Sequence, residues 1–354
     1  MLKIFTIEDS IEWDKIVKSF QDYDAYYLSG YVNAFKMNGD GIPLLFYYEN
    51  ENIKAINIVM KRDIADDSEF NGKINRNEYF DFITPYGYGG WVIEGNGSIK
   101  NLFMEYEKWC IDNNIISEFV RFHPLFENYK NVENIYHIQQ ISDTIYMDLT
   151  SEEIITKNMT SKCRNMVRKA IKNGLTMKED TDLSTIELFK ELYYRTMDKN
   201  NASDSYYFSD KYFLTLFQDR ENVKLFNIFM ENEIVGSSIV LLGKDWIHYH
   251  LSANTPVGYK FAANNLLLYS IANWGSAKGY EKFHLGGGYG GNESSLFKFK
   301  ESMNKNGRLS FAIGRKIFDE KKYDLLVKMV GNDGENIESN FFPLYRLKKE
   351  KKKC

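Results

Sequence analysis

The sequence predicts an α/β protein with mixed sheets, and three observations lead to this fold class. Helical and strand patterns alternate along the whole chain. In the second half, three strands follow one another as a meander, which indicates antiparallel pairing, before a helix and a further strand. The 354 residues are also enough for two domains of ordinary size. We therefore expect mixed sheets rather than one fully parallel, doubly wound sheet.

The first half of the chain contains both kinds of element. Apolar residues over 8–20 recur at helical spacing, with Asp9 and Ser10 as candidate caps. The turn at Asn50–Asn52 joins two apolar runs and indicates a hairpin. In chain order the predicted elements are an edge strand over 2–7, helices over 8–20 and 30–37, hairpin strands over 43–50 and 53–62, a helix over 98–114, a strand over 118–122 and a strand pair over 136–148.

The second half repeats this alternation without obvious internal sequence identity. Gly174 and Gly279 each follow a helical pattern and are suited to the left-handed residue that ends a helix. The predicted elements are helices over 152–159, 162–173, 186–197 and 211–219, strands over 223–230, 233–243 and 245–253, a helix over 262–278, a strand over 282–285, a short helix after 294, a strand over 308–317 and a helix over 319–330.

Composition and charge limit the class of protein. Hydrophobic residues make up 44% and charged residues 27%, as in ordinary globular proteins. The net charge of −4 argues against a general nucleic-acid coat protein, and we expect no DNA partner. Three widely spaced cysteines indicate a reducing compartment, and neither a signal peptide nor a membrane-length apolar run is present. We therefore expect a cytoplasmic protein.

The segment over 245–304 carries the strongest chemical signal. A strand ends at a glycine cluster that includes Gly287 and Gly288, and Lys298 and Lys300 follow in one short helix. Bare backbone can approach a ligand closely at such glycines, and nearby cations favour negative charge. The arrangement suits an anionic cofactor or the oxyanion of a reacting carbonyl.

The helix predicted over 162–173 has a cationic face. At 100° per residue, Arg164, Arg168 and Lys172 share one side with Lys162 and Lys169. Apolar residues, Ile171 among them, occupy the opposite half. This face either docks phosphates or is an ordinary solvated surface, and the sequence leaves both readings open.

Histidines are candidate proton acceptors. His248 and His250 alternate on one strand, but no carboxylate or cysteine accompanies them in the pattern that a metal site requires, so we predict none. His250, His284 and the carboxylate of Glu293 are candidate general bases. The sequence does not choose among them.

Four stretches together resemble one known family: FDFITPYGYGGW from Phe80, SEFVRFHPL from Ser117, SKCRNMVRKAIKNG from Ser161, and the run from Tyr249 through SLFKFKESMN. They are similar to the Fem-type aminoacyl transferases and their BioF2-like acyltransferase relatives, which belong to the GNAT superfamily. The resemblance implies two tandem GNAT-like domains with a central cleft, over 1–149 and 150–330, with 331–354 returning to the first domain.

The resemblance also implies an activity and its residues. It implies transfer of an amino acid from a charged tRNA to an amine of a nucleotide- or lipid-linked cell-wall precursor, with no tightly bound cofactor. Phe299 and Lys300 match the family's functional pair, and Lys36 matches a lysine that contacts the acceptor. Tyr86 and Tyr88 make an aromatic-rimmed turn that either lines the same cleft or is purely structural.

Two alternatives stay open. One is an acyl-CoA-dependent N-acyltransferase acting on an amino sugar or another amine, although GYKFAANN from Gly258 lacks the glycine spacing of the superfamily's pyrophosphate loop. The other is a non-catalytic GNAT-like binding module. The basic tail KKEKKKC could add a peripheral contact with the inner face of the membrane. The sequence does not indicate an oligomeric state.

Overall fold

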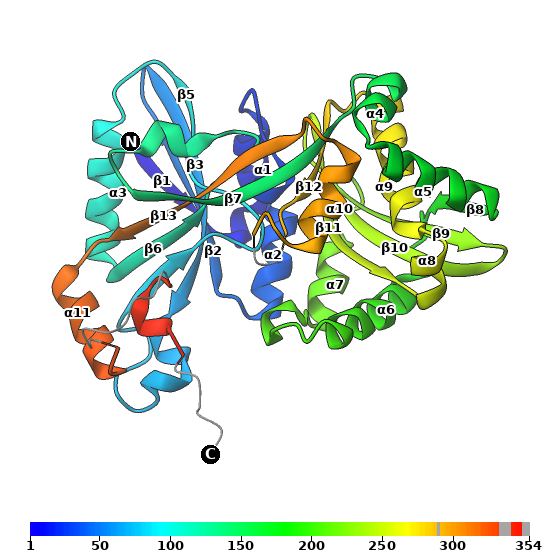
Figure 1. The fold of residues 1–354 in the computed structure, drawn as a ribbon. Coiled ribbons are helices and arrows are strands. Elements are labelled where there is room, and N and C mark those ends of the chain that lie inside the picture. Colours follow the sequence, from blue (N-terminus) through cyan, green and yellow to red (C-terminus); the bar gives the residue numbers. More distant parts are fainter. Residues whose placement is uncertain (289–290, 333–340, 349–354) are drawn as a thin grey trace. The chain divides into compact units, whose positions relative to one another are not determined.

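The computed structural model describes residues 1–288, 291–332 and 341–348. The chain forms two compact units (Figure 1). Unit 1 comprises Met1–Gln21, Gly39–Gln140 and Phe311–Cys354, and unit 2 comprises Asp22–Asn38 and Ile141–Ser310. Each unit has its own set of strands and its own hydrophobic core, so each is described by itself.

The units differ in two segments from the domains expected over 1–149 and 150–330, with 331–354 returning to the first. The segment Asp22–Asn38 belongs to unit 2, because its helix α2 (Ser29–Asn38) packs against α7 (Asp210–Leu216). The segment from Phe311 belongs to unit 1, because strand β13 (Arg308–Ile317) pairs with a strand of that unit from residue 313 onward. Tertiary pairing therefore assigns both segments to a unit distant in sequence.

Unit 1 is built on a mixed sheet in the order β1-β2-β3-β4-β6-β13, with β5 paired to β3. The pair β4–β6 is parallel and the other pairs are antiparallel. The remaining elements are β1 (Leu2–Phe5), β2 (Ile42–Glu49), β3 (Ile53–Asp63), β4 (Phe80–Ile83), β5 (Val92–Gly95), β6 (Ile115–Arg121), α1 (Ser10–Lys18), α3 (Lys100–Asp112) and α11 (Glu320–Met329).

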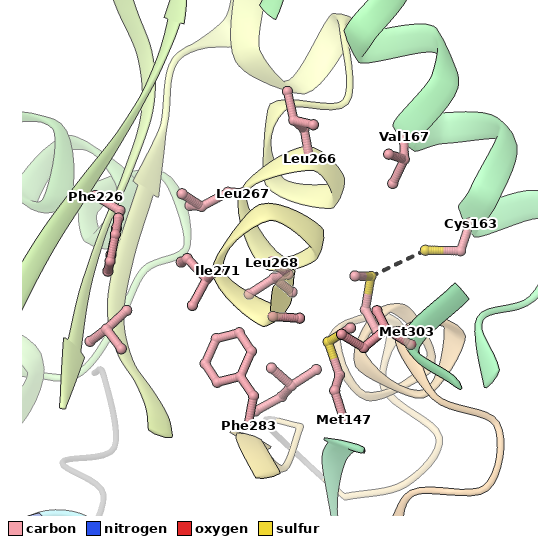
Figure 2. Packing of buried hydrophobic residues seen from close by; sticks show 14 of the residues in the cluster. Met147, Cys163, Val167, Phe226, Leu266, Leu267, Leu268, Ile271, Phe283 and Met303 are labelled. Atoms are coloured by element: carbon pink, nitrogen blue, oxygen red, sulfur yellow. Dashed lines mark hydrogen bonds between the residues drawn. The ribbon is translucent and has the colours of Figure 1, made fainter. Parts of the chain in front are cut away.

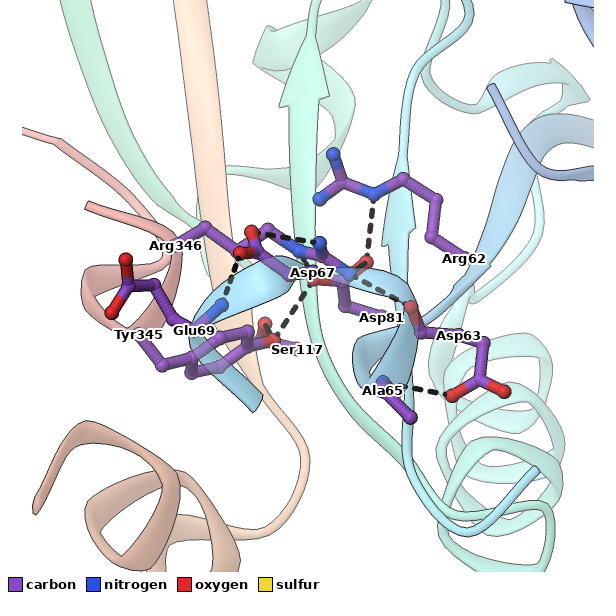
Figure 3. A network of polar contacts seen from close by, with 9 residues as sticks. All are labelled: Arg62, Asp63, Ala65, Asp67, Glu69, Asp81, Ser117, Tyr345 and Arg346. Carbon is purple, nitrogen blue, oxygen red and sulfur yellow. Dashed lines mark hydrogen bonds and ion pairs between the residues drawn. The ribbon is translucent and has the colours of Figure 1, made fainter. Parts of the chain in front are cut away.

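The C-terminal segment packs on unit 1 through a buried ionic network (Figure 3). The Arg346 Nε atom donates to an Asp81 carboxylate oxygen at 2.5 Å, and Arg62 donates to the other oxygen at 2.8 Å. Burial alone would raise the pKa of Asp81, but the two guanidinium groups outweigh it and hold this pKa below its usual value. Tyr345 is fully buried, with its hydroxyl 2.7 Å from Ser117 Oγ. The segment 341–348 is thus fixed to β4 and β6 through Tyr345 and Arg346.

The strands of unit 2 pair in the order β7-β12-β11-β10-β9-β8, again in a mixed arrangement. The pair β11–β12 is parallel, and every other pair in this order is antiparallel. The strands are β7 (His137–Asp148, in unit 2 from Ile141), β8 (Leu175–Glu179), β9 (Val223–Met230), β10 (Glu233–Leu242), β11 (Trp246–Asn254) and β12 (Lys282–Gly286).

Helices cover both faces of this sheet. One face carries α9 (Ala263–Ala277), whose Leu267 and Ile271 point toward Phe226 of β9, while Val167 of α5 (Ser161–Lys172) lies on the other side of α9 (Figure 2). The other face carries α6 and α7, which reach β11. The remaining helices are α4 (Glu152–Asn158), α5 (Ser161–Lys172), α6 (Ile186–Lys199), α8 (Pro256–Lys260) and α10 (Ser295–Met303).

The predicted fold class is confirmed, together with the hairpin β2–β3 and the meander β9–β10–β11. Three local predictions are wrong. Residues 137–148 form one long strand rather than a strand pair, and the sequence reading missed β4, β5, β8 and α8. Ile171, predicted on the buried side of its helix, is 54% exposed. The tip of the glycine cluster (289–290) and the basic tail from 349 lie outside the described residues.

Among the described residues, no helix combines the length and the apolar character needed to cross a membrane.

Candidate active site

The parallel strands of unit 2 part near their carboxyl ends. β11 and β12 pair only from Trp246–His248 to Lys282–His284. Beyond that point β11 stays with β10 as far as Asn254, and its register shifts so that His250 is left as a bulge. We call this parting of β11 and β12 the splay. In open α/β sheets, ligands bind beyond the carboxyl ends of parallel strands, so the splay is the first place to look for a site.

Lys300 lies beside the splay. It is 8% exposed, and its Nζ atom donates to the carbonyl oxygen of Gly287 at 2.7 Å and lies 5.8 Å from the centre of the Tyr249 ring. Burial lowers the pKa of Lys300 to about 8, and in the described part of the chain no carboxylate pairs with it. A desolvated ammonium without a counter-charge is suited to an anion or to a carbonyl oxygen that gains negative charge.

The glycine segment after β12 is held on both sides. A Cβ atom on Gly288 would lie 2.1 Å from Ser294 Oγ, so only glycine fits where α10 begins. Asn292 and Asp143 exchange hydrogen bonds of 2.8 and 2.9 Å, which fasten the segment to β7. The sequence predicts bare N–H groups here, but the described contact with Lys300 is made by the carbonyl of Gly287. The glycines therefore orient the lysine.

The N-terminus of α9 borders the same site. Its N-cap residue, Ala262, has a left-handed backbone conformation with φ of 60°, and no side chain caps the N-terminus of the helix. The Tyr249 hydroxyl donates to Asn264 Oδ1 at 3.1 Å and so connects β11 to this helix. Gly258 serves packing, because a Cβ there would lie 2.0 Å from the Val235 carbonyl oxygen. Sequence reasoning missed Tyr249 and Asn264, since nothing local distinguishes them from other strand aromatics and helical asparagines.

The opposite face of the sheet carries the histidines. Phe283 and Leu285 belong to the core cluster, so His284 between them faces the other side. There it lies beside His248 of β11, with ring centres 5.5 Å apart. His248 Nε2 lies 2.7 Å from Asp24 Oδ2, and all three side chains are buried. Asp24 is a second residue that the sequence did not single out.

His250 fits the predicted general base poorly. Its Nε2 atom lies 2.5 Å from the Tyr212 hydroxyl. Burial, with a smaller contribution from His248, lowers the pKa of His250 to about 3. An imidazole with so low a pKa binds a proton weakly at neutral pH, which argues against this histidine as the base.

The other predicted residues lie on several different elements. Lys298 is mostly exposed and forms an ion pair with Glu293 at 2.8 Å. Phe299 is partly buried against the core of unit 2. Lys36 lies in α2 of unit 2, whereas Tyr86 and Tyr88 follow β4 in unit 1.

Unit 1 also has a parallel strand pair, β4–β6, but these two strands do not part at their carboxyl ends as β11 and β12 do. Arg121, at the end of β6, donates to the carbonyl oxygens of Thr84, Pro85 and Gly87 at 3.0, 2.9 and 3.0 Å. Beyond this loop, Gly89 bridges to Phe122 in parallel fashion. The predicted Tyr86 and Tyr88 therefore belong to a loop that β6 holds through Arg121. The splay that accompanies Lys300 is a feature of unit 2.

The cationic face of α5 is present with two changes. Arg164 donates to the carbonyl oxygens of Thr156 and Met159, and so closes the end of α4. Arg168 and Lys172 are exposed, as are Lys162 and Lys169. Arg164 is thus committed to local structure, as is Lys169, which donates to the Lys260 carbonyl oxygen at 2.6 Å. Arg168, Lys172 and Lys162 are the exposed members that remain to meet a ligand.

Comparison with known proteins gives a consistent result. Residues 161–300 match the family model described as acetyltransferase (GNAT) domain. The crystal structure of FemX matches with a TM-score of 0.66 at 12% identity, over 92% of this chain and 99% of that one. The chain has a FemX-like GNAT fold. No curated protein sequence matches it.

Two further structures share the FemX-like fold. L-PGS from Bacillus licheniformis matches with a TM-score of 0.56 at 13% identity, over 91% of this chain and 96% of that one. The C-terminal domain of a protein assigned as lysylphosphatidylglycerol synthetase, from Agrobacterium fabrum, matches with a TM-score of 0.55 at 11% identity, over 91% and 96%. The family match ends at Lys300 and covers most of unit 2, and together with the fold it supports an acyltransferase.

Proposed function

We propose that the protein is a Fem-type N-acyltransferase that passes an amino acid from a charged tRNA to an amine of a cell-envelope precursor. The observation that carries the proposal is Lys300, a buried ammonium beside the splay of the domain that matches the GNAT model. With a pKa of about 8, Lys300 is mostly protonated at neutral pH. It can therefore neutralise negative charge as soon as that charge forms.

The reaction is aminolysis of an ester. The neutral amine attacks the ester carbonyl carbon, a C–N bond forms and the carbonyl oxygen becomes an oxyanion. Collapse of this intermediate breaks the C–O bond, and the proton lost by the amine reaches the departing tRNA hydroxyl. Lys300 stabilises the oxyanion, and a donor of this kind typically contributes about 3–4 kcal/mol to the transition state. The fold contributes by holding the ester and the amine together.

Exposed cations provide the docking surface for the donor in this proposal. Arg168 and Lys172 lie on α5, which packs against α9 and α10, the two helices that border the splay. RNA phosphates along α5 would leave the esterified end near Lys300. Charge reversal of Arg168 and Lys172 should weaken tRNA binding and flatten its salt dependence. Lys100→Glu, on the exposed face of α3, is the matched control. Equal affinity of all variants at low salt would refute the docking face.

Acyl-CoA is the second candidate donor, and one observation favours it. The N-terminus of α9 has no side-chain cap, and free N–H groups at a helix start suit a pyrophosphate. The deciding experiment offers the purified protein labelled aminoacyl-tRNAs or labelled acetyl-CoA, each with muramyl peptide precursors. We expect RNase-sensitive transfer of the amino acid, lost in Lys300→Met and retained in Lys305→Met, an exposed control in the loop after α10.

Each other outcome of that experiment has a definite meaning. Transfer that survives RNase and requires acetyl-CoA replaces the tRNA donor with the CoA donor. Absence of product with every donor, together with normal ligand binding by Lys300→Met, supports the non-catalytic binding module. We also propose that the protein acts in the cytoplasm and that its basic tail contacts the inner face of the membrane.

A further inference from the structure

Helix α8 connects two features of the candidate site. At its carboxyl end, Lys169 of α5 donates to the carbonyl oxygen of Lys260 at 2.6 Å. Two residues further on, Ala262 is the N-cap of α9, the helix that borders the splay. The start of α8 is fixed as well, because the Thr255 hydroxyl accepts a hydrogen bond from the Gly258 N–H at 3.0 Å. The cationic helix α5 and the N-terminus of α9 therefore meet at α8.

Helix α8 presents a tyrosine to solvent. Tyr259 is 51% exposed, which makes it the most exposed of the described tyrosines, followed by Tyr207 at 36%. Tyr207 is engaged locally, because its hydroxyl donates to Asp198 at 2.8 Å and its ring stacks on that of Tyr194. In the described part of the chain, the contact on the Tyr259 ring is the ammonium of Lys199, 4.5 Å from the ring centre. Half of Tyr259 thus stays open to a ligand.

Cations accompany this ring. Lys199 ends α6, and Lys260 of α8 places its Nζ atom 5.3 Å from the centre of the Phe261 ring. Both lysines are exposed, and neither forms an ion pair among the described residues. The segments 161–172 and 255–265 contain no aspartate or glutamate. An open aromatic ring therefore lies within a positively charged surface, although the whole chain has a net charge of −4.

Tyr259 is also close to the splay. Burial raises the pKa of Tyr249, and the neighbouring phenol of Tyr259 raises it further. Tyr249 in turn lies beside Lys300 and donates to Asn264 of α9. A ligand chain that reaches from the exposed cations of α5 to Lys300 would pass the ring of Tyr259.

The combination of cations and an open aromatic ring suits single-stranded nucleic acid. Proteins that bind single strands pair a positively charged surface, which follows the phosphates, with aromatic side chains on which the bases stack. The bases of a duplex are already stacked on each other and offer no free face to such a ring. In a charged tRNA, unpaired nucleotides lie between the acceptor stem and the ester. This part of the donor fits the surface of α8.

We propose that Tyr259 is a stacking platform for a base of the unpaired 3′ end of the tRNA, with Lys199 and Lys260 beside the phosphates of the same strand. The inference rests on the proposed aminoacyl-tRNA donor and adds the element that guides its end to Lys300. Stacking on a ring tolerates any base, so Tyr259 holds the 3′ end without selecting the amino acid.

The test measures binding of the full-length protein to two RNA hairpins by fluorescence anisotropy. One hairpin is a tRNA acceptor stem with its unpaired 3′ nucleotides, and the other is the same stem without them. For Tyr259→Ala we expect a Kd about tenfold higher for the first hairpin, equivalent to about 1.4 kcal/mol, and an unchanged Kd for the second. Tyr259→Phe keeps the ring and should stay within about twofold of the wild type.

Two further variants complete the set. Lys260→Gln should weaken binding of the first hairpin and reduce its salt dependence, whereas Tyr259→Ala should leave the salt dependence unchanged, because it removes no charge. Phe341→Ala, which truncates an exposed aromatic side chain of unit 1, is the matched control and should bind both hairpins as the wild type does.

Three outcomes overturn the inference. An unchanged Kd of Tyr259→Ala for the first hairpin shows that no base stacks on the ring. Equal weakening of both hairpins shows that the ring supports the surface rather than the unpaired end. Weaker binding of acetyl-CoA by Tyr259→Ala, with RNA binding unaltered, assigns the ring to the adenine of CoA instead.

The proposed function can fail separately from the inference. A wild type that transfers an amino acid from tRNA and binds the first hairpin no better than Tyr259→Ala does refutes the inference alone. A wild type that binds neither hairpin and transfers nothing from charged tRNA refutes the proposed function, and the inference with it.

Discussion

Replacing Lys300 by methionine should change the stability of the protein in a pH-dependent way. Burial lowers the pKa of this lysine from 10.5 to about 8. Each pKa unit corresponds to about 1.4 kcal/mol, so holding the charged amine inside the protein costs about 3 kcal/mol of folding free energy at neutral pH. The hydrogen bond to Gly287 already acts in the folded state, and its loss in Lys300→Met removes about 1 kcal/mol.

The sign of the pH dependence follows from proton binding. Between pH 8 and pH 10.5 the unfolded chain keeps the proton on Lys300 while the folded chain releases it. The unfolded state then binds more protons, so the stability of the wild type rises with pH across this window. Lys300→Met lacks the titrating group and does not share this rise. At pH 7 we expect the variant to be more stable by about 2 kcal/mol, and near pH 10.5 to be equal or slightly less stable.

Urea unfolding of the wild type and Lys300→Met at several pH values between 7 and 10.5 measures this difference directly. Other groups titrate equally in both proteins, so they cancel in the difference. Lys305→Met, an exposed neighbour, should show no such trend. A stability difference between wild type and Lys300→Met that stays constant over this range would show that the amine is not desolvated. The argument for Lys300 as the stabiliser of an oxyanion would then fail as well.

Three further predictions follow from other contacts. Arg346→Met should cost about 3–5 kcal/mol of unfolding free energy, because it removes one cation from the buried Asp81, while Lys348→Met should cost little; equal urea midpoints would contradict this. Because the pKa of His250 is about 3, the NMR chemical shifts of its ring protons should not change between pH 5 and 8. A titration midpoint near pH 6.5 would contradict this prediction. Gly258→Ala should cost about 1–3 kcal/mol, because its Cβ would overlap a carbonyl of β10, and an unaltered Tm would refute the close packing of α8.

The sequence predicted part of the candidate site because several of its features are local. A strand, a glycine cluster and a short helix with Lys300 follow one another directly, so their order could be read from the pattern. The environment of the lysine could not be read, because its burial depends on Tyr249 and on a carbonyl oxygen from a different element. Arg164 shows the same limit: its helical position was predicted, but not the carbonyl groups of α4 that it binds.

Residues that act through long-range contacts were missed for the same reason. Asp24 lies more than two hundred residues from His248 in sequence, and only the tertiary structure brings them together. Asp24 does not differ from its neighbours in type or spacing.

The sequence by itself determined the fold class, most helices and strands, and the chain segment that carries the chemistry, because hydrophobic periodicity, caps and glycines act over a few residues. Only the tertiary structure decided which segments share a unit, where β11 and β12 part, and which polar groups are buried with or without partners. Strand pairing and desolvation join residues that are distant in sequence, and no local pattern encodes them.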